Sequence, residues 1–138
     1  MSQPGGETAI QVEIDLFSGR ANPVWRLTAA EFRELTARLQ SLPVGPPVAI
    51  PEDRLGYRGL HVGPLPAPRG QQEPAAAQAI MAVAAGGGLI NATRRDGSVL
   101  HLIDADHTVE CWLLQIAQGR VDEASRLAAL DALPNRCR

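Results

Sequence analysis

Apolar and polar residues alternate where the patterned part of the chain begins. In residues 10–16, Ile, Val, Ile and Leu take every second position, with Gln, Glu and Asp between them. A period of two predicts a β-strand with one buried face. Ser18-Gly19-Arg20 ends this strand, and Asn22-Pro23 then forces a turn or an extended step. Residues 1–8 carry no such pattern and are expected to be disordered.

A helical period replaces the alternation after Thr28. Thr28 is a good N-cap, and Glu31, three residues later, completes a capping box. Leu27 and Phe32 take the positions of a hydrophobic staple. The apolar residues of one helical face are Phe32, Leu35, Leu39 and Leu42. This spacing predicts a helix that runs from Thr28 to about Leu39 or Leu42.

Proline and glycine interrupt the middle of the chain. Residues 43–51 contain four prolines and predict a connector without helix or central strand. Residues 57–62 predict a short strand, and residues 63–74 form a second Pro/Gly loop that is either functional or disordered. Pro74 suits the first turn of a helix. The residues after it predict a helix through Ala75, Ile80, Met81 and Val83, ending at Gly86-Gly87-Gly88.

The last third of the chain predicts a hairpin and two helices. Residues 89–93 and 99–103 are expected to be strands, because the Asp96-Gly97 pair between them favours a tight hairpin turn. Residues 104–107 then cap a helix that ends at Gly119, and a last helix covers residues 122–133. The whole pattern predicts a single α+β domain over residues 9–134, with residues 135–138 as a mobile tail. Its sheet is expected to be antiparallel or mixed, with about four strands packed against three to four helices.

Charge and composition exclude several classes of function. The chain has 138 residues, a net charge of −2 and no lysine. A binder of nucleic acid normally has a basic face, so no nucleic-acid partner is expected. Without lysine, neither a Schiff base nor a phosphate-binding P-loop lysine is possible. The longest apolar run is too short to span a bilayer and no signal peptide is apparent, so no membrane partner and a cytoplasmic location are expected.

Two short motifs carry a resemblance to other proteins. The first is Phe17-Ser18-Gly19-Arg20-Ala21-Asn22-Pro23-Val24-Trp25, and the second is Gly56-Tyr57-Arg58-Gly59. They resemble a group of small uncharacterised proteins with Phe-Ser-Gly-Arg-Pro-Asn-Pro-x-Trp followed by Gly-Tyr-Arg-Gly. Ala21 departs from that pattern, since the group usually has proline there. The resemblance implies a shared fold and no particular chemistry.

These motifs also supply the candidate ligand-binding residues. They are Arg20, Asn22, Trp25, Tyr57 and Arg58. Arginine suits a carboxylate or phosphate, so a pocket for an anionic or amide-bearing ligand is expected, with Arg20 and Arg58 close together. In the alternative interpretation, Asn22 hydrogen-bonds the turn, Arg20 pairs with a carboxylate such as Asp15, and Trp25 anchors the core.

A second candidate cluster lies near the predicted helix that follows residue 107. His101, His107 and Cys111, with Asp104 and Asp106, include every common type of metal ligand, but their spacing fits no known cage. No metal and no cofactor are therefore expected. His107 and Cys111 also allow a Cys–His nucleophile pair, while a small core cysteine is the simpler interpretation. Two cysteines without a secretion signal do not indicate a disulfide framework.

The sequence therefore leaves two functions open. The first is a non-catalytic binding or accessory module for a partner protein or a small anionic ligand, acting through Arg20 and Asn22. The alternative is a small enzyme that uses His101, His107 and Cys111, with or without a metal. An enzyme requires these groups to converge in a concave pocket.

Overall fold

The protein is an α+β domain with one six-stranded antiparallel sheet. The structure is a computed structural model that describes residues 10–17, 19–50, 56–65, 79–134 and 137. The strand order is β2-β1-β3-β4-β5-β6. The strands are β1 (Ile10–Asp15), β2 (Val24–Leu27), β3 (Gly59–Gly63), β4 (Ile80–Gly86), β5 (Leu89–Arg94) and β6 (Val99–Ile103). The helices of the described ranges are α1 (Ala29–Gln40), α3 (Thr108–Ile116) and α4 (Glu123–Ala132).

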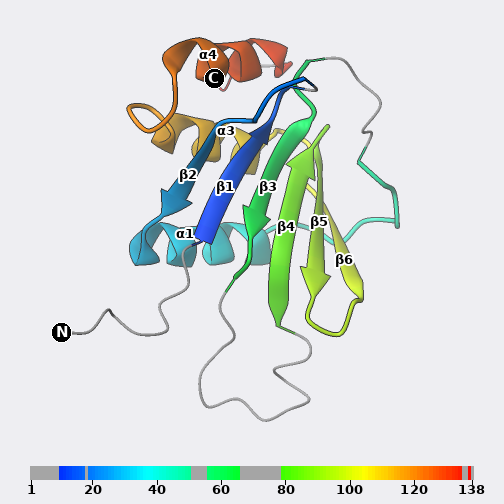
Figure 1. Cartoon of the computed structure of the whole chain (residues 1–138). Helices are drawn as coiled ribbons and strands as arrows, with labels where there is room; N and C mark the ends of the chain where they lie inside the picture. Colours follow the sequence, from blue (N-terminus) through cyan, green and yellow to red (C-terminus); the bar gives the residue numbers. More distant parts are fainter. Residues whose placement is uncertain (1–9, 18, 51–55, 66–78, 135–136, 138) are drawn as a thin grey trace, which may run out of the picture.

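Helices α1 and α3 cover one face of the sheet, α4 lies next to α3 beyond the ends of the strands, and the other face is open (Figure 1). The alternation in β1 aims Val12 and Ile14 at the helices, and both are fully buried. Leu35 of α1 and Leu113 of α3 meet them from the helical layer and are also fully buried. The odd-numbered residues of β1 point to the open face, which therefore carries polar side chains, as is common for an antiparallel sheet.

The expected start of α1 is confirmed. Thr28 Oγ1 accepts a hydrogen bond from the Glu31 backbone N–H at 3.1 Å, and Glu31 Oε1 accepts one from the Thr28 backbone N–H at 2.9 Å. This reciprocal capping box satisfies two N–H groups that the helix cannot satisfy itself. α1 ends at Gln40, within the predicted limits.

The expected number of strands is wrong, because two strands lie where none was predicted. β2 follows the Asn22-Pro23 step and pairs with β1. Residues predicted as a helix through Ala75 and Ile80 instead include β4, which pairs with β3 and β5. Residues 75–78 lie outside the described part. Alanine favours a helix locally, but hydrogen bonding on both edges of a central strand outweighs that preference.

The glycines after β4 explain why the chain turns back at once. Gly87 and Gly88 have φ angles of 62° and 79°, which match a two-residue hairpin turn that L-residues with side chains rarely adopt. The turn was predicted as a helix stop and is instead the β4–β5 hairpin. The hairpin predicted around Asp96-Gly97 is confirmed and joins β5 to β6.

The C-terminal helices are confirmed, but the expectation about the cysteines is wrong. Cys111 of α3 forms a disulfide bond with Cys137, with their Cα atoms 5.2 Å apart. Sequence spacing could not show that the chain folds back over α3 after α4. The predicted disordered residues 1–8 and the tail residues 135, 136 and 138 lie outside the described residues. Among the described helices the longest has 12 residues, and none has the length and apolar character needed to cross a membrane.

Candidate functional site

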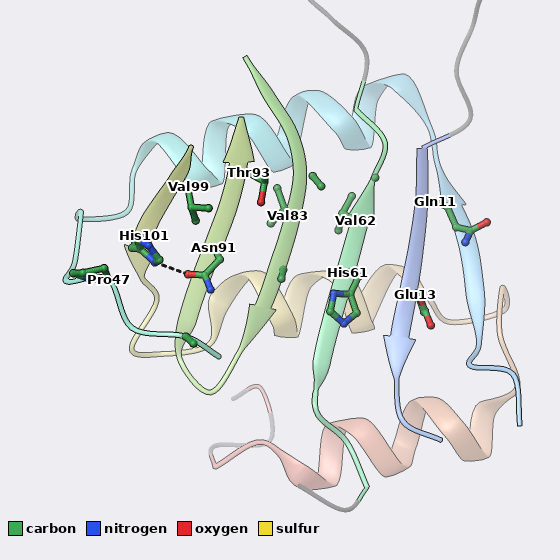
Figure 2. A pocket seen from close by; sticks show the side chains of 14 residues that line it. Gln11, Glu13, Pro47, His61, Val62, Val83, Asn91, Thr93, Val99 and His101 are labelled. Atoms are coloured by element: carbon green, nitrogen blue, oxygen red, sulfur yellow. Dashed lines mark hydrogen bonds between the residues drawn. The ribbon is translucent and has the colours of Figure 1, made fainter. Parts of the chain in front are cut away.

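The open face of the sheet carries a hollow of about 660 Å³, which we call the trough (Figure 2). One row of directly paired residues crosses it from β1 to β6: Glu13, His61, Ala84, Asn91 and His101. Ala84, in the middle of the row, contributes only a methyl group. Gly63 and Ala82 in the neighbouring row are similarly small. Polar side chains therefore stand on both sides of a low floor.

His61 forms the wall of the trough on the β1 side, and Asp15 and Arg58 border an adjoining smaller hollow that His61 also lines. Arg58 Nε and Nη2 donate to Asp15 Oδ1 at 3.0 and 2.7 Å. Asp15 Oδ2 lies 3.3 Å from His61 Nε2. Burial alone would raise the pKa of the Asp15 carboxyl, but its hydrogen bonds to Arg58 and His61 and the positive charge of Arg58 outweigh burial and hold the pKa below its usual value. Asp15 is thus a carboxylate that orients the His61 ring.

His101 and Asn91 form the opposite wall. His101 Nδ1 lies 2.8 Å from Asn91 Oδ1 across the β5–β6 pair (Figure 2). Because the amide oxygen only accepts, the ring nitrogen donates in this contact. The ring of His101 is therefore fixed with Nε2 as its second polar atom, and Asn91 keeps its NH₂ group for another partner.

The proline-rich connector borders the trough at one end. The Gly45 backbone N–H donates to the His101 carbonyl at 2.9 Å, and the Ile103 N–H donates to the Pro43 carbonyl at 2.9 Å. These bonds hold the connector against the edge of β6. Pro47 and Ala49 then reach the rim of the trough. The connector predicted from four prolines therefore contributes directly to the site.

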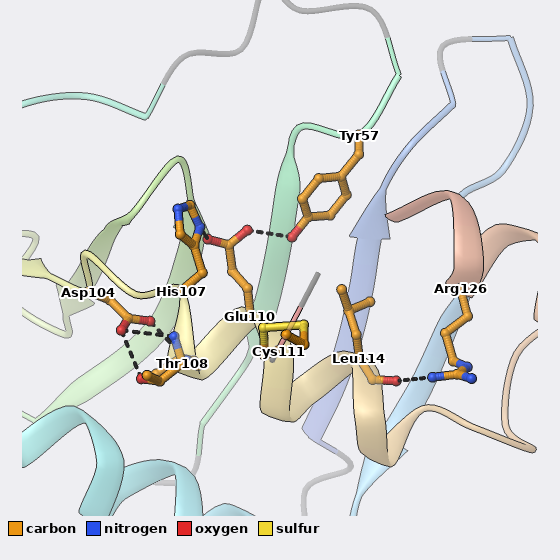
Figure 3. The surroundings of a disulfide bond; sticks show 10 residues. Tyr57, Asp104, His107, Thr108, Glu110, Cys111, Leu114 and Arg126 are labelled. Atoms are coloured by element: carbon orange, nitrogen blue, oxygen red, sulfur yellow. Dashed lines mark hydrogen bonds and ion pairs between the residues drawn. A yellow bond between two sulfur atoms is a disulfide. The ribbon is translucent and has the colours of Figure 1, made fainter. Parts of the chain in front are cut away.

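A separate polar chain lies on the helical side of the sheet (Figure 3). Tyr57 Oη donates to Glu110 Oε1 at 2.6 Å, and Glu110 Oε2 lies 2.8 Å from His107 Nδ1. Glu110 is 1% exposed. Burial raises the pKa of the Tyr57 hydroxyl well above its usual value, and the charge of Glu110 and their hydrogen bond add to the effect. Burial between two partners makes Glu110 a link between α3 and the segment before β3, with little access to a ligand.

The residues predicted as a ligand site divide between structural positions and the trough. Asn22 Oδ1 accepts from the backbone N–H groups of Leu16 and Phe17, and its Nδ2 donates to Glu13. Trp25 is buried in the core, and none of the described residues accepts a hydrogen bond from its Nε1. Both residues therefore hold the fold, as the alternative interpretation expected.

The two arginines of the predicted site contact the same residue. The Arg20 guanidinium carbon lies 3.8 Å from the centre of the Phe17 ring, and Arg58 Nη2 donates to the Phe17 carbonyl at 3.2 Å. The two motifs thus meet at Phe17. Asp15, named as a partner for Arg20, binds Arg58 instead. Of the five predicted residues, Arg58 is the one that borders the hollow beside the trough, together with Asp15, His61, Ala84 and Asn91.

The predicted His/Cys/Asp cluster does not converge. His101 faces the trough, whereas His107 begins α3 on the helical side and Cys111 is bonded to Cys137. Asp104 caps α3, since its Oδ1 and Oδ2 accept from the Thr108 and Val109 backbone N–H groups. Within the described ranges no group of three His, Cys, Asp or Glu side chains could hold a metal ion.

His61 and Asn91 are the site residues that sequence reasoning missed. Neither lies in a recognisable motif, and they are 30 residues apart in the numbering. The available signal was their position in strands with small apolar neighbours. Only the register of β3, β4 and β5 places them in one row.

The trough can bind and orient a small molecule by hydrogen bonds from two fixed walls. Its floor offers only van der Waals contact, and no described residue of its lining is a cysteine or serine nucleophile. Comparison of the chain with protein-family models, with curated proteins and with solved structures found no match.

Proposed function

We propose that this protein is a non-catalytic binding module that holds a small ligand in the trough. One observation carries the proposal: Ala84 lies between His61 and Asn91 in the cross-strand row. Each of these polar side chains is held by a second residue through one of its polar atoms, and its other polar atom takes no part in that contact. Fixed groups lose little conformational entropy on binding, which favours recognition.

The small residues of the floor support this assignment. Ala82 and Ala84 belong to β4, a central strand, where larger β-branched side chains normally pack best. Gly63 beside them leaves the neighbouring position open. Solvation of polar side chains alone does not require a hollow bounded by oriented side chains. A ligand with an apolar body and polar edges suits such a surface.

The alternative enzyme is less well supported by the geometry. Cys111 has no thiol to act as a nucleophile while it is bonded to Cys137. His107 directs Nδ1 to the buried Glu110. The carboxylate-oriented His61 is the feature that favours catalysis most, but a nucleophile within reach of it is missing from the described lining.

Nuclear magnetic resonance with a library of small soluble compounds tests the proposal. Binding compounds should shift the backbone amides of His61, Ala84 and Asn91 together. Ala84→Leu fills the floor of the trough, so it should abolish these shifts while the protein remains folded. Ala37→Leu, at an exposed position of α1, is the matched control and should leave binding unchanged. Shifts confined to the helical side, or binding that survives Ala84→Leu, would refute the proposal.

A further inference from the structure

We infer that the ligand of the trough is an uncharged, flat molecule that carries amide N–H groups at opposite edges. This inference rests on the proposed function, because it names the class of ligand for the same site. Three properties of the trough support it: the hydrogen-bonding polarity of its walls, the balance of charge around it, and the spacing of its strands.

The walls mainly accept hydrogen bonds from a ligand. When His61 donates Nε2–H to Asp15, its neutral ring keeps a lone pair on Nδ1. When His101 donates Nδ1–H to Asn91 Oδ1, its neutral ring keeps a lone pair on Nε2. Each wall therefore presents an acceptor, and a ligand with N–H groups at both edges complements them.

Asn91 adds a donor to this pattern. Its Oδ1 accepts from His101, so its NH₂ group can donate to a ligand carbonyl. An amide provides both an N–H group and a carbonyl oxygen at one edge. The combination of acceptors with one donor therefore matches an amide better than an amine or a carboxylate.

The charge around the trough disfavours an anion. Its charged neighbours are Glu13, Asp15 and Arg58. The Arg58 guanidinium is engaged by Asp15 and by the Phe17 carbonyl, and Glu13 keeps its own negative charge while it accepts from Asn22. Two carboxylates against one guanidinium leave a net negative charge, which repels a carboxylate or phosphate ligand. The anionic ligand expected from the arginines is therefore not the class that we infer.

The spacing of the strands fits a flat ring. His61 and His101 lie on β3 and β6, with β4 and β5 between them, so their backbones are three strand spacings, or about 14 Å, apart. The His101 ring reaches inward to Asn91, whereas the His61 ring contacts Asp15 on the β1 side. The methyl groups of Ala82 and Ala84 form an even floor on which an aromatic ring can lie.

Three probes with the same ring separate the possible classes. Terephthalamide carries an uncharged amide at each end, dimethyl terephthalate keeps the shape and carbonyls without N–H donors, and terephthalate is an anion. Titrations followed by the trough amides should show the diamide binding about fivefold or more tightly than the diester, since each added hydrogen bond contributes about 1 kcal/mol. Terephthalate should bind the most weakly of the three.

Variants of the walls identify the acceptors. His61→Phe and His101→Phe keep a ring and remove the acceptor, so each should weaken the diamide about fivefold and change diester binding less than about twofold. Thermal unfolding of each variant checks that it is folded. If the variants weaken binding of the diamide and of the diester equally, the histidines only shape the trough, and the inferred class is wrong.

The outcomes also separate this inference from the proposed function. If terephthalate binds tightest in the trough and Ala84→Leu abolishes its binding, the binding function stands and the inferred ligand class is wrong. If none of the three probes, nor any library compound, shifts the trough amides, the proposed function itself fails and the inference fails with it.

Discussion

At the scale of single residues, the buried polar side chains are those that connect elements of the fold through hydrogen bonds. Glu110 is almost completely buried, and its carboxylate is satisfied by Tyr57 and His107 (Figure 3). A buried carboxylate without partners would be costly, so Glu110 connects α3 to the segment before β3 only while both partners are present. His107 itself has a φ of 57°, an unusual conformation for a residue with a side chain.

The buried hydroxyl of Tyr57 leads to a prediction about alkaline pH. Because its pKa is raised in the folded state, this group contributes stability below its unfolded pKa of about 10 and loses the contribution as pH rises toward the folded pKa. The chain has one tyrosine and no lysine, and both cysteines are bonded. A fall in stability above pH 10, with phenolate absorbance appearing only on unfolding, is therefore expected.

The control for this prediction is Tyr57→Phe. It removes the hydroxyl without adding atoms, and should lower stability at neutral pH by about 2 kcal/mol because a hydrogen bond to a buried charge is lost. The variant should also lose most of the additional decline above pH 10. Phenolate absorbance in the folded protein near pH 10 would show that Tyr57 is accessible and would contradict the buried contact.

At the scale of elements, local sequence signals determine some elements, and pairing with neighbouring strands determines others. The capping box specifies α1 through residues that are only three positions apart. β4 shows the opposite case, since its alanines favour a helix and its partners β3 and β5 impose a strand. A strand has no internal hydrogen bonds, so residues close in sequence do not specify it.

Thr28→Ala tests the local specification of α1. Loss of the side-chain cap should lower the free energy of unfolding by about 1 kcal/mol. Thr36→Ala is the matched control, because it makes the same change in the middle of the same helix, where Thr36 bonds the Phe32 carbonyl. Alanine is the better helix former there, so the control should cost clearly less. Denaturant unfolding of both variants measures the difference, and equal costs would argue against the cap.

At the scale of the whole molecule, bonds between distant parts of the chain hold the helical layer together. Arg120, after α3, makes two hydrogen bonds to Glu31 at the start of α1. Arg126 of α4 donates to the Leu114 carbonyl of α3 at 3.2 Å. The disulfide between Cys111 and Cys137 then fastens the chain beyond α4 to α3. These contacts connect α4 to α3, and the end of α3 to the start of α1 (Figure 1).

Reduction of the disulfide tests this connection. The bond closes a loop with a sequence separation of 26 residues, and the entropy that it removes from the unfolded chain corresponds to about 3.5 kcal/mol. Reductant should lower the stability of the wild type by about this amount. It should have no effect on Cys137→Ser, which already lacks the bond. Thiols that react in the denatured protein before any reductant is added would show that the bond is absent.

Elements that depend on neighbours in the chain were predictable from local patterns. The alternation of β1, the capping box of α1, the Asp96-Gly97 hairpin and the two C-terminal helices are all short-range, because their hydrogen bonds or turn geometry involve residues a few positions apart. The same signals indicated the role of Asn22 in its turn.

The candidate site, in contrast, depends on contacts between distant segments. Asp15, His61 and Asn91 are separated by dozens of residues, and the antiparallel register alone brings His61 and Asn91 to the trough and Asp15 next to His61. The folded chain also pairs Arg58 with Asp15 in an ion pair and Cys111 with Cys137 in a disulfide bond. Strand pairing and disulfide formation depend on which distant segments meet in the folded chain, and local sequence patterns do not predict which segments these are.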